Sequence, residues 1–240
     1  MNKYGFSQIK RINPNLRDSW NGKIFLSFDI DWAHDDVILD SYNLVSDYSV
    51  ETTWFVTHET DVLRTIGMDK HIELGIHPNF NDLLSGSGGG TSNQVIQEAR
   101  ELVPSATTIR SHSLTQSERL LDQFLDNNFK RICNLFIPYR NQMQVCPYDL
   151  WGGAIIIPHR FQDNASLRIG EDLPERHELN TGLHVFDFHP IHVFLNTESL
   201  DRYERTRPLH HNPSELIKHR YEGYGTRNRL IELLQLAKSV

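Results

Sequence analysis

Short apolar runs alternate along the chain with segments in which apolar residues recur every three or four positions. The short runs predict buried strands, and the longer period predicts amphipathic helices between them. Helices are expected from Asp35 and Asp36, after a cap at Ser92, and after a capping box formed by Thr115 and Glu118. Seven strands are expected, at residues 22–28, 52–57, 71–76, 106–110, 131–137, 154–157 and 183–188.

Strands that alternate with helices favour right-handed βαβ units and a parallel sheet. Seven such strands with helices outside form either an incomplete barrel or an open, doubly wound sheet, and periodicity alone does not decide between these two folds. No repeat, low-complexity tract or linker divides the sequence, so residues 1–240 are expected to form one domain. In both folds the site is expected beyond the carboxyl ends of the strands.

The charge and composition exclude several classes of protein. The 240 residues carry a formal net charge of −7, which argues against a protein that coats nucleic acid. No apolar run approaches the roughly 20 residues that cross a bilayer, and the first 20 residues lack the apolar block of a secretion signal. Two cysteines cannot form a disulfide framework. We therefore expect a soluble, cytoplasmic protein with no nucleic-acid partner and no membrane span.

Polar side chains follow four of the predicted strands. They are Asp29 and Asp31, then His77, then Arg110 and His112, and finally His189. Each group alone is also typical of solvated loop acids or of a packed histidine, but their recurrence at four strand ends indicates a site. Carboxylate and imidazole are the ligands of a catalytic zinc or a similar divalent ion.

These residues and their surroundings resemble the polysaccharide deacetylases of the NodB-homology class, carbohydrate esterase family four. The similarity runs from about Gly22 to the last helix. It includes the Asp-x-Asp pair in residues 28–31, the segments 53–56 and 73–77, the arginine at 110, and the strand that ends in His189. Two positions depart from the family pattern: Asn81 stands where a second histidine is usual, and Ser111-His112 replaces the Pro-Tyr that usually follows the arginine.

The resemblance implies a distorted (β/α)7 barrel and a metal-dependent hydrolase. Asp31 and His77 would bind a divalent ion, with Zn²⁺ as the expected metal. The third ligand would be Asn81 through its amide oxygen, or His112 in its place. Because an amide oxygen is a weaker ligand than imidazole, Asn81 would leave the ion loosely bound or favour another metal.

The same resemblance implies roles in proton transfer for three residues. Asp29 would be the general base that deprotonates a water molecule. Arg110 would pair with Asp29, orient it and keep it ionised. His189 would protonate the leaving amine, because an amine anion is a very poor leaving group.

Other polar residues are candidates for contact with the substrate or for support of the site. His192 follows His189 by three positions, and on an extended strand its side chain would face the opposite way. His34 either lines the mouth of the site or starts a helix. His159, Arg160 and Asp163 follow the sixth strand, where the resemblance places groups that orient catalytic residues.

A basic stretch between Arg202 and Arg220 stands out in an acidic chain. It also contains His210, His211 and His219. One interpretation is a solvated face with loosely paired charges. The other is a binding site for an anionic part of the substrate, such as a diphosphate or a sugar acid.

These expectations together predict a metal-dependent hydrolase that removes an acyl group, most simply acetyl, from an amino sugar. The missing export signal favours a cytoplasmic precursor, a nucleotide-linked or lipid-linked amino sugar made for a surface polysaccharide. Two alternatives stay open. One is a metal-dependent hydrolase of a non-sugar amide, and the other is a non-catalytic carbohydrate-binding or assembly protein on a degenerate deacetylase barrel, which Asn81 favours.

Overall fold

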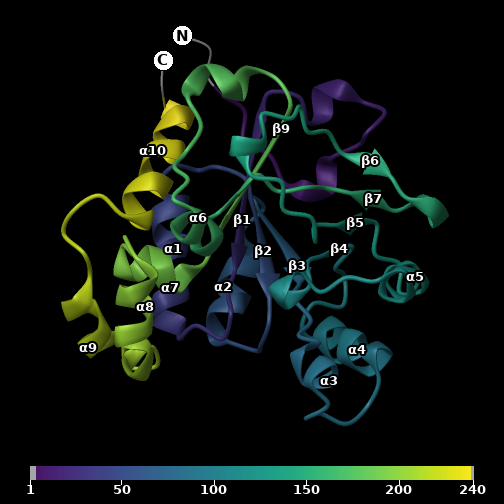
Figure 1. The fold of residues 1–240 in the computed structure, drawn as a ribbon, viewed down its shortest axis with the longest axis horizontal. Coiled ribbons are helices and arrows are strands. Elements are labelled where there is room, and N and C mark those ends of the chain that lie inside the picture. The colour runs from purple at the N-terminus through teal and green to yellow at the C-terminus, as the bar shows by residue number, and fades with distance from the viewer. Residues whose placement is uncertain (1–3, 239–240) are drawn as a thin grey trace.

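The computed structural model describes residues 4–238, and strands and helices alternate through them (Figure 1). The strands are β1 (Lys23–Asp29), β2 (Thr52–Val56), β3 (Ile72–Ile76), β4 (Thr108–Ile109), β5 (Arg131–Ile132), β6 (Tyr148–Asp149), β7 (Ile155–Ile156), β8 (Phe161–Gln162) and β9 (Leu183–Phe188). The α-helices are α1 (Asp35–Ser46), α2 (Asp61–Met68), α3 (Asn81–Ser85), α4 (Ser92–Leu102), α5 (Glu118–Asp126), α6 (Asp163–Ile169), α7 (Pro190–Leu195), α8 (Leu200–Thr206), α9 (Pro213–Leu216) and α10 (Thr226–Lys238).

The described strands form one sheet in the order β6-β7-β5-β4-β3-β2-β1-β9-β8. All neighbours pair in parallel except β6 and β7. The sheet curls into a half-barrel with helices outside it, which confirms the distorted (β/α)7 barrel (Figure 1). The seven predicted strands correspond to β1 to β5, β7 and β9, whereas the short β6 and β8 escaped prediction.

Strands β4 and β5 are two residues long, shorter than predicted. Their ladder ends because a side chain replaces the backbone as hydrogen-bond acceptor. The backbone N–H of Ser111 donates to Oδ1 of Asn134 at 2.8 Å. Such a bond satisfies the buried amide while it releases the chain from the sheet.

The sheet separates two apolar cores. Phe28, Trp54 and Phe188 belong to the core between the sheet and the helices, and the rings of Phe28 and Trp54 stack at 4.3 Å between centroids. Phe25 and Phe55 belong to a smaller core that also takes in Ile9, Ile12 and Trp20 from the N-terminal segment. Because neighbouring residues of a strand point to opposite faces, β1, β2 and β9 each contribute to both cores.

Gly75 in β3 allows the smaller core, which contains Phe55, to pack closely against the sheet. A Cβ atom at this position would lie 2.9 Å from the ring of Phe55 and 2.9 Å from the carbonyl oxygen of Thr108. Neither neighbour has room to move, since both are fully buried. A side chain here would therefore push apart the strands that carry the polar residues.

Two helix caps differ from the sequence prediction by one or two residues. Helix α4 is capped by Thr91 instead of Ser92, and Thr91 and Gln94 form a capping box. Helix α5 is capped by Ser117, whose side chain accepts from the N–H of Leu120, and Thr115 plays no part in it. The cap is the extended residue directly before the first helical one, and composition does not fix that position.

Within the described residues, no helix is both long enough and apolar enough to cross a membrane.

Candidate active site

Strand β1 and the turn after it carry three polar side chains at alternate positions, at increasing exposure. Ser27 and Asp29 are buried, whereas the side chain of Asp31 is 20% exposed. Asp31 and Trp32 occupy a tight turn with φ of 41° and 55°, closed by a bond from the N–H of Ala33 to Ile30 O at 2.8 Å. Left-handed backbone costs roughly 1–3 kcal/mol for each non-glycine residue, and such strain concentrates at functional sites.

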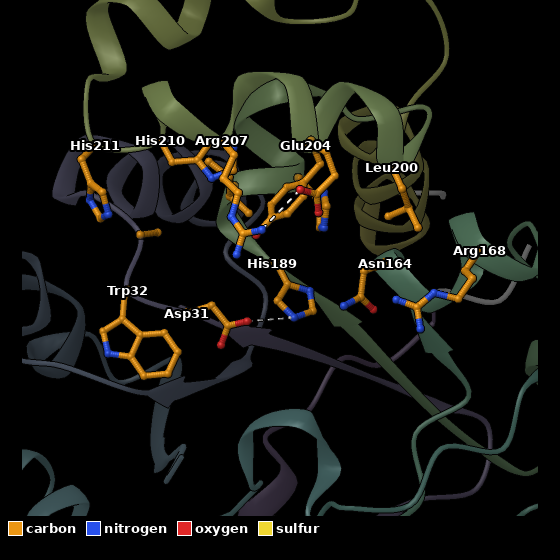
Figure 2. Close-up of a pocket in the computed structure, with 14 residues that line it drawn as sticks. Asp31, Trp32, Asn164, Arg168, His189, Leu200, Glu204, Arg207, His210 and His211 are labelled. Carbon is orange, nitrogen blue, oxygen red and sulfur yellow. Dashed lines mark hydrogen bonds and ion pairs between the residues drawn. The ribbon is translucent and has the colours of Figure 1, made fainter. Parts of the chain in front are cut away.

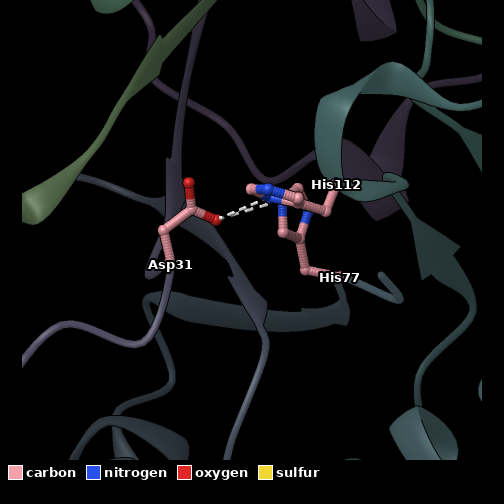
Figure 3. A group of neighbouring side chains, drawn as sticks. All are labelled: Asp31, His77 and His112. Atoms are coloured by element: carbon pink, nitrogen blue, oxygen red, sulfur yellow. Dashed lines mark hydrogen bonds and ion pairs between the residues drawn. The ribbon is translucent and has the colours of Figure 1, made fainter. Parts of the chain in front are cut away.

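Two histidines from two other strand ends converge on Asp31 (Figure 3). Nε2 of His77 lies 3.3 Å from Oδ1 of Asp31, and Nδ1 of His112 lies 3.2 Å from the same oxygen. His77 follows β3, and His112 begins the 3₁₀ turn after β4. The structure thus brings Asp31, His77 and His112 into one group that is open to solvent on one side.

The donor atoms of this group fit a small divalent cation. The ligands of a tetrahedral Zn²⁺ lie about 2.0–2.2 Å from the ion and so about 3.3 Å from one another. That spacing matches the two distances to Asp31. Burial by itself raises the pKa of Asp31, but hydrogen bonds from His112 and His77 bring it well below its usual value, so the carboxylate is ionised.

Arg110 lies fully buried beneath this group. Its Nη1 donates to Oδ1 of Asp29 at 2.8 Å and to Oγ of Ser27 at 3.0 Å, and it also pairs with Asp187. The guanidinium packs over the ring of Phe55 at 4.3 Å. Burial works to raise the pKa of Asp29, but the charges of Arg110 and His77 lower it below its usual value. Asp29 is therefore held as a buried, ionised carboxylate.

His189, at the end of β9, is held by the first residue of α6. Its Nδ1 lies 2.6 Å from Oδ1 of Asp163, and its backbone N–H donates to Oδ2 of Asp163 at 2.7 Å. Its Nε2 points to Asp31, with 3.5 Å between Nε2 and Oδ2. Burial works to lower the pKa of His189, but the charge of Asp163 and its hydrogen bond raise it well above the ordinary value. The ring is therefore fixed by Asp163 at Nδ1 and faces Asp31 with Nε2.

Comparison with known proteins identifies the relatives of this arrangement. A profile of the WbmS-like polysaccharide deacetylases matches residues 26–207. The chain belongs to this deacetylase family. A crystal structure from Bordetella bronchiseptica, of a protein described as a polysaccharide deacetylase involved in O-antigen biosynthesis, shares 36% identity and a TM-score of 0.92 over 98% of each chain.

A polysaccharide deacetylase structure from Mycobacterium smegmatis shares 15% identity with this chain, over 90% of it and 92% of that chain. Its TM-score is 0.47. Among curated proteins, no sequence matches the chain.

Asn81 does not join the group around Asp31, although it stands where the deacetylase pattern usually has a second histidine. It is an exposed residue at the start of α3, and its Nδ2 donates to Oγ of Ser113 at 3.4 Å. His112 approaches Asp31 instead, because the 3₁₀ turn after β4 directs its ring inward. Of the two alternatives for the third ligand, the geometry favours His112 over Asn81.

Asp187 is a site residue that the sequence interpretation missed. It is completely buried in β9, its Oδ1 accepts from Ser27 Oγ at 2.9 Å, and it contacts Arg110. Burial raises the pKa of Asp187 to about 8, although Arg110 opposes the shift. A signal was present, since Asp187 precedes His189 by two positions and so shares its face of the strand.

His192 is close to His189, but not in the way expected. It lies in α7, whose helix begins at Pro190, and so the expectation of an extended strand is wrong. A proline at the first helical position is a common start signal that the sequence contained. The rings of His189 and His192 meet edge to face at 5.7 Å, and burial lowers the pKa of His192 to about 4.

Two further candidates have roles elsewhere in the fold. His34 caps α1, where its Nδ1 accepts from the N–H of Asp36 at 3.2 Å, so it starts a helix. Arg160 packs its guanidinium over the ring of Tyr139 at 4.2 Å and donates to the carbonyl oxygen of Ile137. Neither lines the cavities beside Asp31. Of the three residues expected after the sixth strand, Asp163 contacts His189, whereas Arg160 packs on Tyr139 and His159 stacks on the ring of Phe136.

Proposed function

We propose that this protein hydrolyses the N-acyl group, most simply acetyl, of an amino sugar with the help of a bound divalent ion. The observation that carries the proposal is the meeting of three parts at one edge of the barrel. They are the Asp31, His77 and His112 group, the Asp29–Arg110 pair and the Asp163–His189 pair. Membership of the deacetylase family supports the same reaction.

Asp31, His77 and His112 would hold the ion, with Zn²⁺ suited to one carboxylate and two imidazoles. A bound divalent ion lowers the pKa of a water molecule and polarises an acyl oxygen. Asp29 lies next to this group, since its Oδ2 is 3.6 Å from Nε2 of His77. In the proposed reaction Asp29 accepts a proton from the attacking water, while Arg110 keeps the carboxylate ionised and oriented.

His189 completes the reaction from the other side of Asp31. Its Nε2 delivers a proton to the nitrogen of the scissile amide, so the products are a free amine and a carboxylic acid. Asp163 fixes the ring through Nδ1 and stabilises its protonated form. Base and acid therefore lie beside different members of the group, Asp29 beside His77 and His189 beside Asp31.

The structure from Bordetella bronchiseptica suggests the setting of the reaction, because that protein is described as involved in O-antigen biosynthesis. We propose that the present chain likewise acts on an amino sugar destined for a surface polysaccharide. A nucleotide-linked or lipid-linked precursor is the substrate form expected from the sequence. The cytoplasmic location stays a prediction of the sequence.

The first experiment measures metal binding in the purified protein and its variants by elemental analysis and titration. Wild-type protein should bind about one divalent ion, whereas Asp31→Ala and His77→Ala should bind none, because each removes a ligand. His112→Ala should weaken binding by about tenfold or more, and Asn81→Ala should bind as the wild type does. Full occupancy in Asp31→Ala and His77→Ala would refute the ligand set. Loss of metal in Asn81→Ala alone would return Asn81 to it.

The second measurement is release of carboxylic acid from N-acetylated amino sugars, free and linked to a nucleotide. The metal-loaded wild type should release acetate, and chelation followed by dialysis should stop it. A metal-loaded, folded protein that binds these sugars without hydrolysing them would support the non-catalytic alternative. Asn81 favoured that alternative because it is a weaker ligand than histidine, but His112 lies at Asp31 in its place.

A further inference from the structure

A cavity of about 470 Å³ opens beside His189 and Asp31 (Figure 2). Its floor carries these two residues, and its walls come from α6, α8 and the 3₁₀ turn Arg207–Leu209. Two arginines line it: Arg168 from α6 and Arg207 from the turn after α8. In Figure 2 the guanidinium of Arg207 points down toward His189 and Asp31, and Arg168 lies at the far side, beyond Asn164.

Both arginines are available to a ligand. Arg168 is exposed, and its side chain makes no hydrogen bond or ion pair with the residues from 4 to 238. Arg207 pairs with Glu204 at 3.3 Å, but both side chains are more than half exposed. Exposed pairs of this kind contribute only about 0–1 kcal/mol, so the pairing leaves Arg207 free to bind another anion.

A second cavity adjoins the group of Asp31, His77 and His112, and its charged lining residues are all acidic. It is about 370 Å³ in volume, shares Trp32 with the first, and also contacts His77. Asp82 and Glu98 line it together with apolar residues of α4, and its lining includes no arginine or lysine. The first cavity carries Asp31 and Glu204 beside its two arginines, whereas the second carries carboxylates and no arginine or lysine. The two cavities meet at Trp32, and only the first offers guanidinium groups to a negative charge near the reacting bond.

We propose that the first cavity binds an anionic group of the amino-sugar substrate, a carboxylate or a phosphate, between Arg168 and Arg207. This inference rests on the proposed function, in which the acyl group lies over Asp31 and His189. Guanidinium groups bind both anions through paired N–H donors, so the shared chemistry is a planar or tetrahedral oxyanion on the sugar. The second cavity, which carries Asp82 and Glu98, would repel such a group.

Binding is measured first, with deacetylated sugars that cannot turn over. Isothermal titration of the metal-loaded wild type compares a hexosamine without an acidic group (here called the neutral sugar), the matching hexosaminuronic acid and the matching nucleotide-diphosphate hexosamine. At least one anionic sugar should bind about tenfold or more tightly than the neutral one, as expected for charge-assisted hydrogen bonds. Raising the NaCl concentration from 50 to 500 mM should reduce this advantage. Preference for the uronic acid would identify a carboxylate, and preference for the nucleotide sugar would identify a phosphate.

Variants locate the effect. Arg168→Gln and Arg207→Gln should each remove part of the preference for the anionic sugar, the double variant should abolish it, and the affinity for the neutral sugar should stay the same. Arg205→Gln is the matched control, because Arg205 lies on α8, is 67% exposed and pairs with Asp201 outside the cavity. Glu98→Gln tests the second cavity and should leave the preference intact.

Equal affinity for neutral and anionic sugars would overturn the inference, and so would a preference that survives the double variant. These outcomes are independent of the proposed reaction, because no turnover is needed. A protein that prefers the anionic sugar but releases no acetate keeps the anion site and loses the deacetylase function. A protein that deacetylates neutral and anionic sugars equally well keeps the deacetylase function and loses the anion site.

Discussion

Two groups of charged side chains lie one above the other along β1, and they differ in how completely their partners satisfy them. In the lower group Ser27, Asp29 and Asp187 surround Arg110, and all four residues are buried. The upper group is the cluster of Asp31, His77 and His112, where Asp31 and His112 are about one-fifth exposed. The residue step from Asp29 to Asp31 separates the two groups.

The difference between these groups fits the roles proposed for their aspartates. The lower group supplies its own countercharge in Arg110, so it has a fixed geometry and needs no added ion. The upper group has one carboxylate and two imidazoles whose lone pairs converge without a cation from the chain. In the proposed function the two aspartates, two positions apart, act as base and ligand because only Asp29 is buried against a cation of the chain.

The largest expected effect comes from Asp29→Asn. This substitution keeps the shape of the side chain but removes the base, so turnover should fall by about 10²–10⁴-fold. Metal content should remain that of the wild type, because Asp29 belongs to the lower group. The measurement combines acetate release with elemental analysis on one preparation. Loss of metal together with turnover would erase the distinction between the two groups, and substantial residual turnover would remove Asp29 as the base.

Substitutions of Asp187 test whether the lower group needs a charge at that position. Burial raises the pKa of Asp187 to about 8, which favours the neutral form of its carboxyl. Asp187→Asn should therefore cost little stability, whereas Asp187→Ala leaves Arg110 without one acceptor and should cost about 1–3 kcal/mol. Urea unfolding measures both variants. If Asp187→Asn were as damaging as Asp187→Ala, the group would require the ionised carboxylate.

The two groups also mark the limit of what the sequence reveals. The strands were predictable because runs such as residues 52–57 are β-branched and aromatic throughout, and the parallel fold follows from their alternation with helices. The polar residues at strand ends were predictable for the same reason. The choice between Asn81 and His112 was not, because it depends on how two turns direct their side chains.

The missed residues share one cause. Asp187 lies inside a strand, and an inward-facing carboxylate is recognisable only when the phase of that strand relative to the barrel is known. The phase could have been set by the Asp187-x-His189 spacing, matched to Ser27-x-Asp29 on the neighbouring strand. Likewise, Trp32 and Arg168 become neighbours of the site only through the turn after β1 and the placement of α6.

The smallest expected effect is a loss of folding stability on acidification. It arises at His184, away from the candidate site, and so distinguishes titration of the fold from titration of the site. His184 is the second residue of β9, with Nε2 donating to Thr181 O and Nδ1 accepting from the hydroxyl of Tyr139. Burial lowers the pKa of His184 to about 4, below its unfolded value near 6.5. The unfolded chain therefore binds more protons, so this stabilisation is complete above pH 6.5 and is lost as the pH falls toward 4.

Between pH 7 and pH 5 this histidine should account for a loss of about 2 kcal/mol in the free energy of unfolding. His184→Gln should flatten the pH dependence by that amount, as measured by urea unfolding at both pH values. Because His184 lies at the opposite end of β9 from His189, the metal content of the variant at pH 7 should match the wild type. An unchanged slope in His184→Gln would show that His184 is not the group that titrates. A loss of acetate release at pH 5 in a still-folded protein would then be assigned to the groups around Asp31 and Arg110 themselves.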